Sequence, residues 1–144
     1  AMKKILFPFL FTLSVVTICI GNSLTAAEKM KVVYHVSEVE KVPFVLGNIR
    51  NHIKGVGSAE KLKLVLVVHG PAGKAFHKAK AQTKVKQRVE MLELDGVKFN
   101  MCGNTMNAQK VKLGDLLPGF SRHDEGGVVR IAELQSEGYI YIRP

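Results

Sequence analysis

The chain has 144 residues, a formal net charge of +9 at neutral pH, 47% hydrophobic residues and two cysteines. This length fits a single domain, and the apolar content excludes a wholly disordered chain. Two cysteines are too few for a disulfide framework or for a multi-cysteine metal site.

The first 27 residues have the order of a secretory signal peptide. Ala1, ahead of the methionine, is interpreted as a cloning residue. Lys3 and Lys4 form a basic region, and sixteen mostly apolar residues follow it. Small residues suited to a signal peptidase end the segment at Ala26 and Ala27. A retained membrane anchor is the alternative, but this run is shorter than the roughly 20 apolar residues of a spanning helix and contains a proline.

We therefore expect residues 1–27 to be removed on export and residues 28–144 to form one domain in the periplasm. Residues 1–27 carry two of the 21 basic residues and none of the 12 acidic ones, so the exported chain has a net charge of +7. Cys19 leaves with the segment, and Cys102 remains as the only thiol. If the segment is retained, contact with a membrane is expected.

Strands and helices alternate along residues 28–144. Runs of β-branched or continuous apolar residues predict strands, and apolar residues three or four positions apart predict helices. The predicted strands are Lys31–Val36, Leu64–Val68, Val97–Met101 and Tyr139–Ile142. The predicted helices run from Val42 to Ile53 (closed by Gly55 and Gly57), through Val85, Val89 and Leu92, over Asn104–Val111, and from Val128 to Gly138. The polar segment Ser121–Gly127 is assigned to neither. This order predicts a three-layer α/β/α fold with a mostly parallel sheet.

Two loops lie at the carboxyl ends of the predicted strands, where ligands bind in open parallel sheets. His69 begins the first loop and is a candidate to bind an anionic substrate or to tune a nearby thiolate. Cys102 begins the second, between a strand and the start of a helix. Backbone N–H groups and the positive end of the helix dipole favour a thiolate there. Asn104 and Thr105 are expected to cap the helix, and Gly103 leaves the backbone beside the sulfur bare.

The role of Cys102 has two interpretations. A free cysteine is commonly a small apolar filler in a core. As a thiolate, it can instead carry sulfur as a persulfide, form a mixed disulfide or attack an electrophile. The exported chain has no second cysteine to resolve a disulfide, which excludes intramolecular exchange of the thioredoxin kind.

Three segments resemble the DsrE/DsrF-like proteins: Val67–Pro71, Phe99–Thr105 and Leu134–Ile142. They occur in the same order and spacing, and the likeness runs through nearly all of residues 30–144. The resemblance implies a compact α/β fold of about five strands, assembled as trimers or hexamers. It also implies a cysteine that receives and passes on sulfane sulfur, and the matching position is Cys102. We assign the neighbouring positions to substrate binding: His69, Gly70, Gly103, Asn104 and Thr105.

Neither a metal nor a cofactor is expected. The five histidines lack metal-ligand spacing, and Gly70–Lys74 lacks the length and the hydroxyl residue of a phosphate loop. Lys80, Lys84 and Arg88 repeat every four residues and are predicted to form one helical stripe. Few aromatic residues accompany them, so nucleic acid is excluded as a partner. We expect the stripe to be a solvated face, or to attract anionic lipid or small oxyanions.

Two functions remain. The first is an exported sulfur carrier or sulfurtransferase that holds sulfane sulfur as a persulfide on Cys102 and exchanges it with a donor or acceptor protein or a small sulfur anion. The second is a non-catalytic oligomeric binding module with a structural Cys102 and a basic face for a partner or a membrane. A hydrolase with Cys–His chemistry requires His69 to touch the sulfur and ranks below both. The sequence leaves open whether the chain catalyses turnover.

Overall fold

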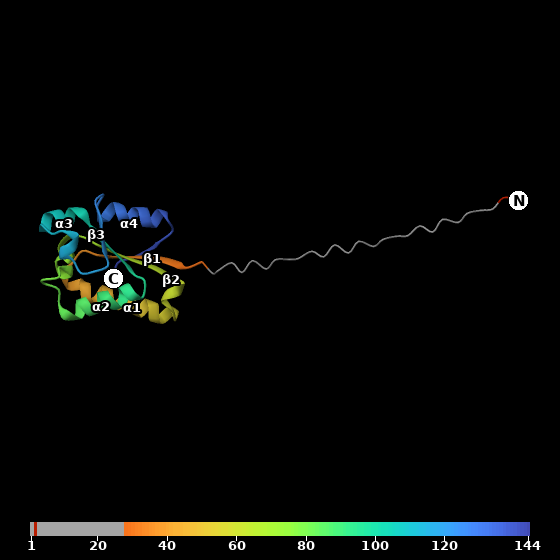
Figure 1. The fold of residues 1–144 in the computed structure, drawn as a ribbon, viewed down its shortest axis with the longest axis horizontal. Coiled ribbons are helices and arrows are strands. Elements are labelled where there is room, and N and C mark those ends of the chain that lie inside the picture. Colours follow the sequence, from red (N-terminus) through yellow and green to blue (C-terminus); the bar gives the residue numbers. More distant parts are fainter. Residues whose placement is uncertain (1, 3–27) are drawn as a thin grey trace.

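Five parallel strands form one sheet, in the spatial order β4-β3-β2-β1-β5. The computed structural model describes Met2 and residues 28–144, so the predicted signal segment, Met2 aside, lies outside the described residues (Figure 1). The strands are β1 (Met30–Val36), β2 (Leu62–Val68), β3 (Lys98–Cys102), β4 (Phe120–His123) and β5 (Ile140–Ile142).

Helices cover both faces of the sheet. They are α1 (Val42–Val56), α2 (Thr83–Leu94), α3 (Gly103–Gln109) and α4 (Gly127–Ser136). Short 3-10 helices are η1 (Val39–Lys41), η2 (Ala59–Lys61), η3 (Gly70–Phe76) and η4 (Leu113–Asp115). Figure 1 shows α1 and α2 on one face and α3 and α4 on the other. This confirms the three-layer α/β/α prediction. Among the helices of the described residues, none has the length and apolar content needed to cross a membrane.

The sheet is buried on both sides, which explains the continuous apolar run of β2. As the central strand, β2 exposes at most 5% of any residue between Leu64 and Val68. The larger core lies between the sheet and the α1–α2 layer and includes Leu46, Leu66 and Phe76. A smaller cluster packs under α4: Val33, Val65, Val67, Ile131 and Leu134.

The sequence analysis missed one strand. β4 lies within the segment that was left unassigned because its residues are polar. It is an edge strand in which only Phe120 is buried. The hydroxyl of Ser121 accepts a hydrogen bond from the Asn100 side chain on β3 at 2.9 Å, so a polar partner takes the place of apolar packing. An edge strand with polar partners does not show apolar alternation.

The predicted basic stripe does not form. Helix α2 begins at Thr83, and Lys80 lies in the turn before it, where its N–H donates to the carbonyl of His77 at 2.9 Å. Arg88 is half-buried and donates to the carbonyl of Pro43 on α1 at 2.6 Å. A spacing of four residues gives a common face only if all of its members belong to one helix.

Most other predicted boundaries are close to the observed ones. Gly55 lies inside α1, and Gly57 alone ends it, with a left-handed φ of 87° that suits glycine. Helix α3 starts one residue earlier than predicted because Cys102 is its N-cap, and it ends at Gln109.

Candidate functional site

Cys102 is the last residue of β3 and the N-cap of α3. Its side chain is 6% exposed. The start of α4 also lies against it, because a Cβ placed on Gly127 would be 3.2 Å from the Cβ of Cys102. The thiol is therefore located where two helices begin, and the unpaired N–H groups of both first turns are directed toward this region.

The surroundings of the thiol favour its charged form. Burial by itself raises the pKa of Cys102. Hydrogen bonding from the Thr105 hydroxyl and from the backbone amides of Thr105, Gly127 and Asn104 outweighs that effect, so the pKa lies below its ordinary value. Donors aimed at the sulfur stabilise negative charge, and a lowered pKa increases the fraction of the nucleophilic thiolate at neutral pH.

Thr105 joins the two loops of the site. Its hydroxyl oxygen accepts a hydrogen bond from the amide of Gly70, at the end of β2, at 2.7 Å. A hydroxyl has two acceptor positions and one hydrogen, so this bond leaves its hydrogen free to point at the Cys102 sulfur. The prediction that Thr105 caps α3 is wrong, because the side chain bonds across to the neighbouring loop and Cys102 occupies the cap position. Asn104 makes no capping bond to α3 either.

A second contact fixes the same loop. The side-chain amide of Gln109 donates to the carbonyl of Gly70 at 2.9 Å, and its oxygen lies 2.8 Å from Nε2 of His77. Gly70 is thereby held through both its N–H and its C=O groups, and its φ of +60° is one that glycine adopts without strain. The loop after β2 is consequently fixed relative to the helix that begins at Cys102.

Gly103 lets another segment approach the site. A Cβ at this position would lie 2.9 Å from the carbonyl oxygen of His123 and 2.9 Å from the Cα of Asp124, both backbone atoms. The segment between β4 and α4 passes so close that a side chain has no room. The sequence analysis placed Gly103 in substrate binding, whereas the structure places it in contact with this segment, outside the cleft.

An open cleft of about 530 Å³ lies over the thiol. Four of the five predicted binding positions line it together with Cys102: His69, Gly70, Asn104 and Thr105. Lys74 and Gln109 also line it, although the sequence analysis did not assign them to the site. Larger clefts lie at the amino ends of the strands and beside α2, and neither is lined by a cysteine or a histidine.

His69 is half-buried and stacks on His35, with 4.6 Å between the ring centroids. Burial and then the positive charge of Arg143 lower the pKa of His69, whereas Glu38 acts in the opposite direction. Burial, followed by the charges of His69 and Arg143, lowers the pKa of His35 to about 4. Nδ1 of His35 lies 2.7 Å from the hydroxyl of Tyr141. Both rings are therefore mainly neutral at pH 7.

His69 and Cys102 both lie against Gly127, since a Cβ placed there would be 3.2 Å from the Cβ of each. Within residues 28–144, however, no hydrogen bond joins the two side chains, and His69 is not among the groups that shift the pKa of Cys102. No set of three or more His, Cys, Asp or Glu side chains in that range is placed to hold a metal ion.

The comparison with known families agrees with the fold. The sequence model of the DsrE/DsrF-like family matches residues 25–144. The chain belongs to this family. DsrE/DsrF-like proteins are associated in general with sulfur relay.

Two solved structures resemble this DsrE/DsrF-like chain. The protein of unknown function MTH1491 from Methanobacterium thermoautotrophicum has a TM-score of 0.72 at 28% identity, over 81% of this chain and 100% of its own. The ychN protein from E. coli has a TM-score of 0.60 at 16% identity, over 81% of this chain and 99% of its own, which is a likeness of fold. No curated protein matches this chain.

The position of Cys102 at the end of a strand was predictable from sequence, but its hydrogen-bonding partners were only partly so. Gly127 was missed because it is far from Cys102 in the chain. The pair Gly126–Gly127 directly before an apolar helical pattern is the one local signal of a close backbone approach. Gln109 and Lys74 carry no such signal.

Proposed function

We propose that this chain, exported as its first 27 residues predict, carries sulfane sulfur as a persulfide on Cys102. The observation that supports the proposal is the position of Cys102, which is the N-cap of α3, lies against the start of α4 and lines an open cleft. The Thr105 hydroxyl and the amides of Thr105, Gly127 and Asn104 lower the pKa of its thiol there. A cysteine that only fills space in a core needs no donors, and burial alone would keep it a thiol. Here the donors offset burial at the floor of an open cleft.

The proposed transfer is a displacement at sulfur. The Cys102 thiolate attacks the outer sulfur of a donor persulfide, a bond forms between Sγ and that sulfur, and the donor's S–S bond breaks. The donor leaves as a thiolate with the electron pair of the broken bond, so one thiolate is consumed, one is formed, and no external oxidant or reductant is required. The reverse displacement, by an acceptor thiolate on the outer sulfur of the Cys102 persulfide, unloads the protein.

Mass spectrometry of the full chain after incubation with polysulfide tests this proposal. Cleavage after Lys98 and Lys110 yields a peptide of residues 99–110 that contains Cys102 and separates it from Cys19. After alkylation, this peptide is expected to carry added mass in multiples of about 32 Da, one sulfur atom each, and the Cys102→Ser peptide is expected to carry none. Equal gain in both peptides, or gain in neither, would refute the proposal.

The 6% exposure of Cys102 favours one competing function, a binding module in which this cysteine is structural. That function predicts slow alkylation of the thiol at neutral pH and an apparent pKa at or above that of a free cysteine. It also predicts that Cys102→Ala leaves partner binding unchanged. Fast alkylation with a depressed apparent pKa excludes it, because such a thiol is both accessible and charged.

A further inference from the structure

Five exposed lysines lie on η3, on the turn that follows it and around the end of α3, and both η3 and the end of α3 contribute residues to the lining of the Cys102 cleft. We refer to them as the lysine rim: Lys74, Lys78, Lys80, Lys110 and Lys112. The sequence analysis placed Lys80 on a helical stripe, and the structure instead places it in the turn before α2, in a groove that shares Lys74 with this cleft.

Shared clefts and backbone hydrogen bonds join the elements of the rim into one surface. Lys74 lines the Cys102 cleft and also, with Lys80, a neighbouring groove of about 190 Å³. The amide of Lys78 donates to the carbonyl of Asp115 at 2.8 Å, and its Nζ donates to the carbonyl of Gly114 at 2.7 Å, which ties the turn after η3 to η4. Lys110 and Lys112 lie on the short stretch between α3 and η4.

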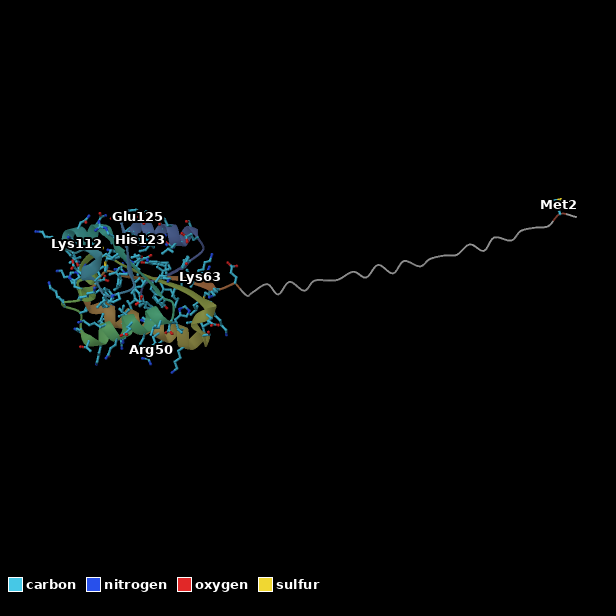
Figure 2. The ribbon with its side chains drawn as sticks, viewed as in Figure 1. Met2, Arg50, Lys63, Lys112, His123 and Glu125 are labelled. Atoms are coloured by element: carbon cyan, nitrogen blue, oxygen red, sulfur yellow. The ribbon has the colours of Figure 1, made fainter. Side chains whose placement is uncertain are left out.

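The rim is at the functional end of the sheet. Figure 2 shows Lys112 at the end of the molecule where the parallel strands finish, and Lys63 at the opposite end, near the start of β2. Cys102, as the last residue of β3, is at the same end as Lys112.

The positive charge of the rim is not neutralised. Within residues 28–144, none of its five lysines forms a salt bridge. Of the acids on adjoining elements, Glu38 pairs with Arg143, and Asp124 pairs with Arg122. The carboxylate of Asp115 accepts a hydrogen bond from the backbone N–H of Lys112. Glu40 is exposed on η1, which packs against η3. The rim therefore keeps an excess of positive charge on this part of the surface, and Lys74 brings part of it to the Cys102 cleft.

We propose that the lysine rim docks an acidic surface of a partner protein, and that this partner presents or receives the sulfur at Cys102. The inference rests on the proposed function. The extent of the rim favours a macromolecule over a small anion, because only Lys74 lines the cleft and the other four lysines lie outside it. A small anion in the cleft would have one lysine beside it. A protein surface large enough to cover the cleft also faces the outer lysines.

Charge complementarity of this kind acts mainly on the rate of encounter, by about 10-fold to 1,000-fold at low ionic strength. Its range is short, since the Debye length is about 8 Å at physiological ionic strength. The outer lysines consequently influence a partner only if charges of that partner come close to them while its sulfur reaches Cys102.

Thiol–disulfide exchange with two synthetic peptides tests the proposal. Both peptides have one cysteine activated as a thiopyridyl disulfide; one is rich in Glu, and the other has Gln in place of every Glu. The Cys102 thiolate attacks the cysteine sulfur of the peptide, the mixed disulfide forms, and the thiopyridone that leaves is followed by its absorbance. The full chain is used, and the rate of its Cys102→Ser variant is subtracted, which removes any contribution from Cys19.

We expect the Glu peptide to react at least about tenfold faster than the Gln peptide at low salt, and the ratio to approach one as salt is raised. In the triple variant Lys78→Gln, Lys80→Gln, Lys110→Gln, whose altered residues lie outside the cleft, the ratio should fall severalfold. The matched control removes the same number of charges from other exposed lysines: Lys54→Gln, Lys63→Gln, Lys98→Gln. It should keep the wild-type ratio.

Three outcomes would overturn the inference. They are equal rates for the two peptides, an unchanged ratio in the triple rim variant, and an equal loss in the matched control. If Lys74→Gln abolishes the preference for the Glu peptide and the triple rim variant does not, the charge effect belongs to the single lysine in the cleft and not to the rim. The site would then suit a small anion, and the rim would have no docking role. The exchange reaction needs no persulfide, so failure of the peptide preference and failure of sulfur loading on residues 99–110 are separate results.

Discussion

Replacing Thr105 by valine removes the one side-chain hydroxyl that stabilises the Cys102 thiolate and keeps nearly the same shape. A hydrogen bond to a charged group contributes about 1.5–3 kcal/mol. Since 1.36 kcal/mol corresponds to one pKa unit, we expect the pKa of Cys102 to rise by about one to two units in Thr105→Val. The rate at which the thiolate reacts at neutral pH should therefore fall by about tenfold or more.

The pH dependence of iodoacetamide alkylation, followed on the peptide of residues 99–110, measures this pKa. Thr105→Ser is the matched control, because it keeps the hydroxyl and is expected to keep the pKa within a few tenths of a unit of the wild-type value. Thr105→Val also leaves the amide of Gly70 without its acceptor, at a cost of about 1–3 kcal/mol in stability. Urea denaturation therefore has to show that the variant is folded under the assay conditions. A folded Thr105→Val whose alkylation midpoint equals that of Thr105→Ser would refute the hydroxyl's role in holding the thiolate.

Two further predictions concern stability. Because the pKa of His35 is about 4 when folded and about 6.5 when unfolded, the unfolded chain binds the extra proton between these values. The neutral His35 ring therefore contributes fully to the free energy of unfolding above pH 6.5, and this contribution is lost as the pH falls toward 4. Between pH 7 and pH 4.5, the free energy of unfolding measured by urea titration should fall by about 2–3 kcal/mol less in His35→Phe than in wild type. Equal falls in the two proteins would contradict the lowered pKa of His35. Gly103→Ala places a methyl group 2.9 Å from backbone atoms of His123 and Asp124. Thermal unfolding should therefore show a destabilisation of about 1–3 kcal/mol. Gly114→Ala is the control, because the space around Gly114 is open and no such clash arises.

Local patterns were sufficient to predict much of the fold, because four of the strands and three of the four helices carry their own apolar signal. β4 does not, since its side chains on one face bond to polar partners such as Asn100, which only the sheet brings near. The same division applies to the site. The position of Cys102 between a strand and a helix is a local property of the sequence. The amide of Gly127 and the loop at Gly70 reach it through tertiary packing, and no spacing in the chain indicates that.

Under the proposed function, the N-cap position of Cys102 would give the loaded and unloaded forms different environments. A disulfide-type S–S bond is about 2.05 Å long, so a sulfur added to Sγ carries the negative charge outward by about that distance. The charge then leaves the fixed amides of Thr105, Gly127 and Asn104 and moves toward the cleft, where Lys74 is the lining cation. Loading thus transfers the charge from a rigid backbone cradle to a flexible side chain near solvent. In the proposed cycle the empty form would be the more protected nucleophile, and the loaded form would present its outer sulfur to whatever reaches the cleft.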